Sequence, residues 1–308
     1  MTPKTINRLQ KAEKALGTWQ VRLERHLDQL RATFYSEGTW ASLYLPETDV
    51  PPGDLPSMTS VDLLAGDLRV EVEISGEEIP PIPSAPYPTE LVTTPRGLAG
   101  FLCKATRKDR PHMDVVAVSH GCAAATNGHR LHVVGAEEIP KEFDVLVPAR
   151  TLKLATKLGE GPDLHIAFRA SGPIVIQADP WILTTFAPTV KFPPVHQVVP
   201  NKQSEAVATV EVDEILSALK RLRKFGPTVT IRSEVSGKDL LLTSEGASAR
   251  IERAFGDGAI STVLGSRYLK EAIFPGAGVT LVFWGRRDPV EICSDGADAW
   301  ALVVPWGD

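Results

Sequence analysis

The chain has 308 residues, a formal net charge of −5, 43% hydrophobic residues and 23% charged residues. This length corresponds to two domains, or two domains and a small extra segment, and the composition excludes global disorder, a collagen-like chain and a disulfide scaffold. No run of about 18 uncharged apolar residues occurs, and charged residues occupy the N-terminus where a signal peptide would have its apolar run. We therefore expect a cytoplasmic protein that has no contact with a membrane.

The N-terminal region contains the strongest helical pattern of the chain, over residues 4–35. Its apolar positions include four leucines spaced by seven residues, which are Leu9, Leu16, Leu23 and Leu30. Gly17-Thr18 can divide the stretch into two helices. The leucine spacing fits a dimerising coiled coil, but His26 and Thr33 at the other seam positions fit equally well a helix packed on its own domain. Both alternatives stay open.

Proline-rich sequence separates this region from the rest of the chain. Residues 79–88 include five prolines, which cannot belong to a central strand and indicate a stiff linker. Before them, residues 67–74 alternate polar and apolar side chains, which predicts one half-buried strand. We interpret residues 1–78 as an N-terminal helical segment with short strands.

After the linker, one helix followed by several short strands occurs four times. The helices are expected to start near Pro95, Pro148, Val212 and Gly265, and strands are expected at 114–118, 130–134, 164–168, 173–177, 228–232, 239–243, 279–283 and 289–293. Each helix is followed by several strands, so the pattern indicates α+β units with antiparallel sheets rather than a parallel sheet built from βαβ units. It predicts two domains, over residues 89–200 and 201–308.

Basic residues gather at all four of these helices. They are Arg96, Lys104, Arg107, Lys108, Arg150, Lys153, Lys157, Lys220, Arg221, Arg223, Lys224, Arg267 and Lys270. For a single helix, such residues are explained by helix propensity on a solvated face. Four basic helices in an acidic chain instead favour contact with a phosphate backbone that does not depend on sequence.

Motifs for bond chemistry are missing from the sequence. It has no GxSxG elbow, HExxH helix, P-loop or Rossmann glycine loop. Asn127-Gly128 before His129 can resemble a turn that carries a catalytic histidine, but Asn-Gly between two apolar strands primarily indicates a β-hairpin. The cysteines, Cys103, Cys122 and Cys293, lie far apart and outside any CxxC or Cys/His spacing. We therefore expect no enzymatic activity, no catalytic residue, no cofactor and no metal site.

Several segments, taken together and in order, resemble the bacterial DNA polymerase III beta subunit, the replication sliding clamp. Ala125-Thr-Asn-Gly-His-Arg-Leu131 is similar to that family's Ala-Thr-Asp-Gly-His-Arg-Leu motif, and Phe192-Pro-Pro-Val-His-Gln-Val-Val-Pro200 is similar to its Phe-Pro-Asp-Tyr segment. Residues 288–292 and 301–305 resemble the final strands and terminal proline. Residues 147–152 and 266–270 stand where a clamp begins a helix. The resemblance covers about residues 88–308.

The departures from the family concern both the motifs and the N-terminus. Asn127 replaces an Asp, Pro194 and Val195 replace Asp and Tyr, and the chain ends in Trp306-Gly-Asp308 rather than a basic and hydrophobic tail. Residues 1–88 do not resemble the first of the three clamp domains, which indicates a reduced or replaced domain. Two full domains per chain would close a six-domain ring as a trimer, whereas a shortened first domain would keep the dimer of bacterial clamps.

The resemblance implies a function. It implies DNA-clamp domains with two helices each on antiparallel sheets, a ring around double-stranded DNA, basic helices that face the DNA, and docking of DNA polymerase and clamp loader through short linear motifs. The docking pocket would consist of Met113, Thr126, Gly128, His129, Arg130, Leu131, Pro193, Gln197, Val198, Val304, Pro305 and Trp306. Met113 is aligned loosely, and Gln197 stands where the family often has Arg. Leu131 and Val304 fit a place in the core as well as a place in the pocket.

Two other functions stay open on the sequence. In one, the chain is a clamp-like interaction scaffold that does not encircle DNA, because the N-terminal segment sets the oligomeric state or blocks the ring. In the other, that segment is a DNA- or protein-binding module, as its basic residues suggest; these are Lys4, Arg8, Lys11, Lys14, Arg22, Arg25 and Arg31.

Overall fold

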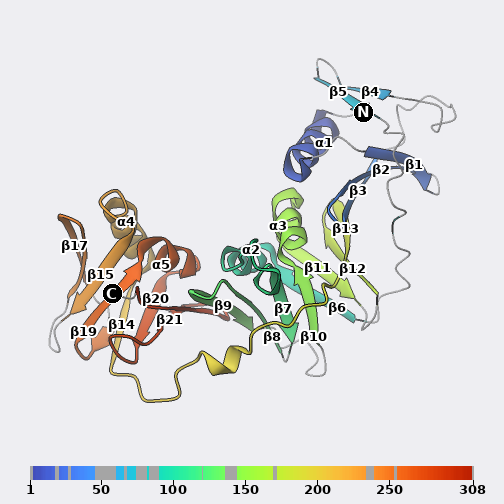
Figure 1. Cartoon of the computed structure of the whole chain (residues 1–308). Coiled ribbons are helices and arrows are strands. Elements are labelled where there is room, and N and C mark those ends of the chain that lie inside the picture. Colours follow the sequence, from blue (N-terminus) through green and yellow to red (C-terminus); the bar gives the residue numbers. More distant parts are fainter. Residues whose placement is uncertain are drawn as a thin grey trace. The chain divides into compact units, whose positions relative to one another are not determined.

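The computed structural model describes residues 3–17, 21–26, 29–45, 60–65, 68–73, 82, 90–119, 121–135, 144–168, 172–233, 239–252 and 255–306. The chain divides into two compact units, each made of two segments (Figure 1). Unit 1 comprises residues 1–100 and 145–189, and unit 2 comprises residues 101–144 and 190–308. Helix α2 (Arg96–Lys104) and strand β10 (Asp144–Pro148) cross the boundary between the segments. The expected linker at 79–88 lies outside the described residues except for Ile82.

Unit 1 is built on one antiparallel sheet of seven strands. Their order is β1 (Val21–His26), β2 (Gln29–Ser36), β3 (Thr39–Leu45), β13 (Trp181–Phe186), β12 (Pro173–Ala178), β11 (Asp163–Phe168) and β6 (Glu90–Pro95). Helices α1 (Pro3–Leu16) and α3 (Ala149–Leu158) pack against each other in this unit. A separate hairpin joins β4 (Ser60–Ala65) to β5 (Leu68–Glu73), and β5 confirms the strand predicted over 67–74.

The long N-terminal helix predicted over residues 4–35 is wrong in its second half. The helix ends at Leu16, and Gly17 follows with φ +66°, a left-handed conformation that commonly closes a helix. Residues 21–36 form β1 and β2, where Leu23 and Leu30 are strand residues. Leu9 and Leu16 are buried within unit 1. The coiled-coil alternative is therefore wrong, because two of its four leucines are not on a helix.

The described residues of unit 2 form two sheets and two complete helices. Eight strands of one antiparallel sheet follow the order β7 (Val115–Ser119), β8 (Cys122–Thr126), β9 (Arg130–Gly135), β22 (Ala299–Val303), β21 (Val290–Ser294), β20 (Gly278–Phe283), β14 (Ala206–Glu211) and β18 (Phe255–Asp257). The other sheet follows the order β17 (Ala247–Glu252), β16 (Asp239–Ser244), β15 (Thr228–Ser233) and β19 (Ile260–Gly265). The helices are α4 (Val212–Leu222) and α5 (Ser266–Ala272).

Helix α4 illustrates why these segments fold as they do. Its apolar residues recur every three or four positions, and the buried ones are Val212, Ile215, Ala218, Leu219 and Leu222. The preceding strand β14 alternates buried and half-buried residues until Glu211, where the helix begins. The period thus changes from two to 3.6 at one residue. All four predicted helix starts and all eight predicted strands are confirmed, as is the α+β class.

The repeat predicted four times occurs five times in the described residues. A helix followed by three antiparallel strands is formed by α1–β1–β2–β3, α2–β7–β8–β9, α3–β11–β12–β13, α4–β15–β16–β17 and α5–β20–β21–β22. Two sheets are continuous across the end of one such group: β3 pairs with β13 in unit 1, and β9 pairs with β22 in unit 2. We call these pairs seam 1 and seam 2. The N-terminal segment is therefore built like the other groups.

Within the described part of the chain, every helix is too short or too polar to cross a membrane.

Candidate functional site

The turn between β8 and β9, at one end of seam 2, is fixed by its own side chains. Gly128 has φ +87°, which favours glycine. The side-chain oxygen of Asn127 accepts hydrogen bonds from the backbone N–H groups of His129 (2.9 Å) and Arg130 (3.0 Å). The Thr126 hydroxyl donates to the Arg130 carbonyl at 2.7 Å and accepts from the Gly128 N–H at 3.1 Å. The hairpin predicted from Asn-Gly is confirmed, and it holds His129 and Arg130 in fixed positions.

Tyr268, on α5, lies against both of these residues. The His129 and Tyr268 rings are stacked, with centroids 5.8 Å apart and planes 12° apart. The Arg130 guanidinium lies 5.0 Å from the centre of the Tyr268 ring, within cation–π range. Neither Tyr268 nor its neighbour Glu271 was among the residues expected at the pocket.

Arg130 is almost completely buried, with 5% of its surface exposed. Its guanidinium forms an ion pair with Glu271 and donates to the Lys104 carbonyl. Glu271 also accepts a hydrogen bond from Arg267 at 2.9 Å. A buried charge without such partners would be strongly destabilising, so Glu271 is needed to keep Arg130 inside the protein.

The electrostatics follow from this burial. Burial lowers the pKa of Arg130, and the hydrogen bond and charge of Glu271 oppose that effect. Burial alone would raise the pKa of Glu271, but hydrogen bonds from Arg267 and Arg130 outweigh it and hold the pKa below its ordinary value. His132 lies two residues after Arg130, on the same face of β9. Burial lowers its pKa to about 3. The neutral His132 ring donates through Nδ1 to the Phe101 carbonyl at 2.7 Å.

The C-terminal residues complete this side of seam 2. The Val304 N–H donates to the His129 carbonyl at 2.9 Å, and the Trp306 N–H donates to the Val263 carbonyl at 2.8 Å. A Cβ atom placed on Gly265 would lie 3.1 Å from the Tyr268 ring and 3.6 Å from the Trp306 ring, so the two rings are neighbours. Trp306 is 52% exposed. We call His129, Tyr268 and Trp306 the aromatic patch.

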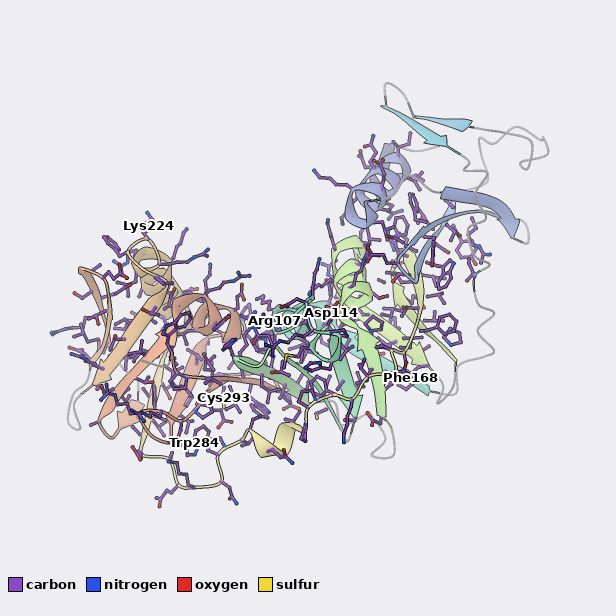
Figure 2. All side chains as sticks on the ribbon, in the orientation of Figure 1. Arg107, Asp114, Phe168, Lys224, Trp284 and Cys293 are labelled. Atoms are coloured by element: carbon purple, nitrogen blue, oxygen red, sulfur yellow. The ribbon has the colours of Figure 1, made fainter. Side chains whose placement is uncertain are left out.

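The opposite face of the same strands is covered by residues 192–199. Phe192, Val195 and Val199 pack on an apolar cluster that consists of Ala124, Leu131, Val133, Trp284 and Leu302 (Figure 2 labels Trp284). Because side chains alternate along a strand, Leu131 points to this face, whereas Arg130 and His132 point to the other. Leu131 is only 4% exposed, so it belongs to the core.

The structure thus gathers some of the expected pocket residues and separates others. Met113 reaches the turn, with its Cε 3.5 Å from a Cβ placed on Gly128. The residues around the turn and the patch are Met113, Thr126, Gly128, His129, Arg130, Val304, Pro305 and Trp306. Pro193, Gln197 and Val198 lie in the segment that covers the Leu131 face. Gln197 and Val198 are exposed there, and Pro193 is half-buried.

Tyr268 and Glu271 leave a signal in the sequence that could have identified them. Arg130 and His132 alternate with Leu131 and Val133, so two ionisable side chains share one face of a strand that must be buried. A buried arginine requires a carboxylate. In the described residues, Glu271 supplies it from α5, with Tyr268 three positions earlier on the helix surface that faces the strand.

The residues expected to face DNA differ in how they are engaged. Arg96 donates to the Gly159 carbonyl, and Arg150 bonds the Ser36 hydroxyl at 2.9 Å and pairs with Glu37, all within unit 1. In unit 2, Arg107 pairs with Asp109 at 2.6 Å. The exposed residues include Lys104, Lys108, Lys157, Lys220, Arg221, Arg223, Lys224, Arg267 and Lys270, and Lys153 is half-buried.

A metal centre has no counterpart in the described residues, which contain no group of three or more His, Cys, Asp or Glu placed to hold an ion. What the geometry offers instead is a rigid, partly exposed aromatic surface next to cations. Such a surface can bind an apolar side chain and the polar or acidic groups beside it.

The sequence matches no family model and no curated protein. Similar solved structures include the DNA polymerase III subunit beta from Borrelia burgdorferi (13% identity, 99% of this chain and 97% of that chain, TM-score 0.80). They also include the DNA polymerase sliding clamps from Bacillus subtilis (14%, 99% and 97%, TM-score 0.78) and Pseudomonas aeruginosa (16%, 98% and 97%, TM-score 0.77). The fold of this chain is therefore that of the sliding clamps. Because nearly the whole chain is covered, the likeness includes the N-terminal segment, which the sequence motifs had left outside it.

Proposed function

We propose that the chain is a sliding-clamp-like processivity factor, which encircles duplex DNA and tethers replication proteins through short peptide motifs. The observation that carries this proposal is the fivefold helix-plus-three-strands repeat with sheets continuous across two seams, in a chain that has the sliding-clamp fold from end to end. A scaffold of this kind supplies position and charge rather than a reacting group. Fold alone does not imply function, so the charge and the site must support it separately.

The charge supports contact with DNA. The chain carries a net charge of −5, yet the C-terminal end of α4 presents Lys220, Arg221, Arg223 and Lys224, all exposed. Helix α5 adds exposed Arg267 and Lys270. Cations that contact only phosphates hold DNA without reading its sequence and permit sliding. The topological link of a closed ring would then provide processivity, and each single contact would matter little.

The aromatic patch supports peptide docking. Trp306 and Tyr268 present adjoining rings, and His129 is stacked on Tyr268, so the patch offers a rigid surface for a hydrophobic anchor. Rings at such a surface lose little conformational entropy on binding. Val304, which is 41% exposed, extends the apolar surface. We propose that the DNA polymerase and the clamp loader dock at this patch, and that Val198 and Gln197, which lie in the segment on the opposite face of the strands, do not take part.

The repeat supports a dimeric ring. Each full clamp domain contains two helix-plus-three-strands groups, and the described residues contain five groups, of which α1–β1–β2–β3 is the first. The N-terminal segment thus has the form of half a domain followed by the β4–β5 hairpin. A reduced first domain favours the dimeric ring over the trimer, which would need two domains per chain.

The proposal is tested by loading the protein onto DNA. We expect it to be retained on nicked circular duplex and lost from the same duplex after linearisation, at a salt concentration that abolishes simple binding. The mass in solution, measured by light scattering, should correspond to a ring, and a dimer is expected. Equal loss from circular and linear DNA, by a protein that still binds partner peptides, would instead establish the scaffold that does not encircle DNA.

A further inference from the structure

The end of α4 is followed by an exposed phenyl ring that comes directly after four cations in the chain. Phe225 is 52% exposed and follows Lys220, Arg221, Arg223 and Lys224, all of which are exposed. In the described part of the chain, none of these four cations forms a side-chain ion pair. Figure 2 shows Lys224 at the outer end of α4. A favourable helix dipole accounts for cations at this end of a helix, but it does not account for an exposed phenyl ring beside them.

The ring is presented by a fixed turn. The Phe225 N–H donates to the Leu222 carbonyl at 2.9 Å, and the Lys224 N–H donates to the Arg221 carbonyl at 3.3 Å. Gly226 follows in a tight site, where an added Cβ would lie 3.0 Å from the Ser244 hydroxyl and 3.2 Å from the Glu245 carboxyl carbon. The Glu245 carboxylate thus lies next to this turn, and the four cations outnumber it. The backbone of Phe225 is thus held in place while its ring remains half in solvent.

The other exposed apolar side chains of the described residues lie in different surroundings. They are Phe186, Val198, Val304 and Trp306. Phe186 is 49% exposed but packs edge-on against Trp40, with ring centroids 6.1 Å apart, and it has no cationic neighbour within four residues along the chain. Among the exposed aromatic side chains that the structure describes, Phe225 alone combines a free ring with four preceding cations. Phe186 is therefore a matched control for the exposure of an aromatic ring.

We propose that Phe225 and the four cations bind single-stranded nucleic acid, with a base stacked on the phenyl ring and the flanking phosphates on the cations. Paired bases in a duplex are stacked on each other and are not available to the ring, whereas unpaired bases are. Duplex contact would require only the cations. The inference deepens the proposed function and rests on it for the source of the strand, which would be the unpaired template beside a primer end.

The test is direct binding of the full-length protein to an oligothymidylate of about 12 nucleotides with a central 2-aminopurine. We expect Phe225→Ala to weaken binding roughly tenfold and to abolish the change in 2-aminopurine fluorescence, because stacking of a base on an aromatic ring is lost. Phe225→Tyr should retain both signals. The control Phe186→Ala should bind within about twofold of the unchanged protein.

One double variant tests the phosphate contacts. Replacing Lys220 and Arg221 together by alanine should reduce the slope of log affinity against log salt by about 1.4, two contacts at about 0.7 each. Equal affinity of Phe225→Ala and the unchanged protein, or an unchanged fluorescence signal, would overturn the inference. If the unchanged protein were not retained on circular duplex, the proposed function would be overturned instead, because that assay does not depend on single-strand binding.

Discussion

The two seams use the same backbone arrangement with different side chains. In seam 1, the first residue after the turn glycine Gly38 is Thr39, and it contacts Thr151, the third residue of α3. In seam 2, the first residue after Gly128 is His129, and it contacts Tyr268, the third residue of α5. In unit 1 the contact joins the β2–β3 turn to helix α3, and in unit 2 it joins the β8–β9 turn to helix α5. The arrangement of the chain is therefore repeated, although the residues are not.

The side chains make one seam closed and the other open. The Thr39 and Thr151 hydroxyls lie 2.8 Å apart, and both residues are buried. In seam 2, His129 is exposed, Tyr268 is half-buried, and Trp306 is 52% exposed. Small polar pairs close seam 1, whereas large rings at the same positions leave a surface in seam 2. The candidate site thus resides in substitutions on a repeated scaffold, which explains why the fold by itself does not locate it.

The largest difference between the seams should appear on removing the helix partner of each strand. Glu271→Ala leaves the buried Arg130 guanidinium without its carboxylate, and we expect it to destabilise unit 2 by about 3 kcal/mol. Thr151→Ala removes one neutral hydrogen bond from seam 1 and should cost about 1 kcal/mol. Urea unfolding gives both values, and hydrogen exchange on β9, β22, β3 and β13 assigns each loss to its seam.

Arg267→Ala is the matched control for Glu271→Ala. Arg267 bonds the same carboxylate, but its side chain is 69% exposed, so its loss should cost less than about 0.5 kcal/mol. If Arg267→Ala proved as costly as Glu271→Ala, the stability would come from the surface pair between Arg267 and Glu271 and not from the buried Arg130.

Peptide binding should separate the seams next. The double variant His129→Thr, Tyr268→Thr gives seam 2 the threonine pair of seam 1, and we expect roughly tenfold weaker binding of a partner peptide with little loss of stability. Trp306→Ala, at a side chain largely in solvent, should weaken binding by a similar factor. Both are measured by fluorescence anisotropy of a labelled peptide.

Leu131→Ala is not a suitable probe of the pocket, although the sequence placed Leu131 there. Leu131 is 4% exposed and packs with Trp284 and Leu302, so its truncation should cost about 2–5 kcal/mol of stability.

Unchanged peptide affinity of the His129→Thr, Tyr268→Thr double variant, with an intact fold, would show that the aromatic patch is not the docking site.

The sequence predicted the parts of the fold that depend on local period and turn chemistry. The change from strand to helix at Val212 and the Asn127-Gly128 hairpin depend on neighbours in the chain, and both are confirmed. The helix predicted through Leu30 is wrong. The seven-residue leucine spacing continues past Gly17, but residues 21–36 form strands that pair with each other and with β3. Periodicity does not distinguish a helix from strands when leucines happen to recur.

The candidate site was predictable where it lies in one motif and not where it joins distant segments. His129 and Arg130 belong to the turn motif, and their geometry follows from Asn127. Tyr268 and Glu271 come from a helix more than a hundred residues away, and only the burial of Arg130 requires them. The N-terminal repeat was also missed, since α1 and α2 begin 93 residues apart whereas the later helices begin 53 to 63 residues apart.

The turn glycines offer a test in which the seams should agree. Gly38 has φ +78° and Gly128 has φ +87°, so alanine at either position is strained by about 1 kcal/mol. A Cβ on Gly38 meets nothing within 4 Å, and one on Gly128 makes ordinary contact with Met113 at 3.5 Å. We expect Gly38→Ala and Gly128→Ala to lower the free energy of unfolding equally. A difference above about 1 kcal/mol would show that the two turns are not the same device.

A small effect is expected from the ion pair between Arg8 of α1 and Glu160, within unit 1. Arg8 donates to both Glu160 oxygens, at 2.7 and 2.8 Å, and these hydrogen bonds lower the pKa of Glu160 to about 2. A lowered pKa stabilises the fold above the ordinary pKa of 4.5, and this stabilisation is lost as the pH falls through about 2.

The Glu160 side chain is 36% exposed, so screening limits the contribution to less than about 1 kcal/mol. Urea titrations at about pH 6 and about pH 2.5 should show this loss, and Glu160→Gln should remove that part of the pH dependence. In unit 2, the pKa of Glu271 is also lowered, and its partner Arg130 is buried. Protonation of Glu271 should therefore cost more than protonation of Glu160, because it leaves a buried charge unpaired rather than a solvated one.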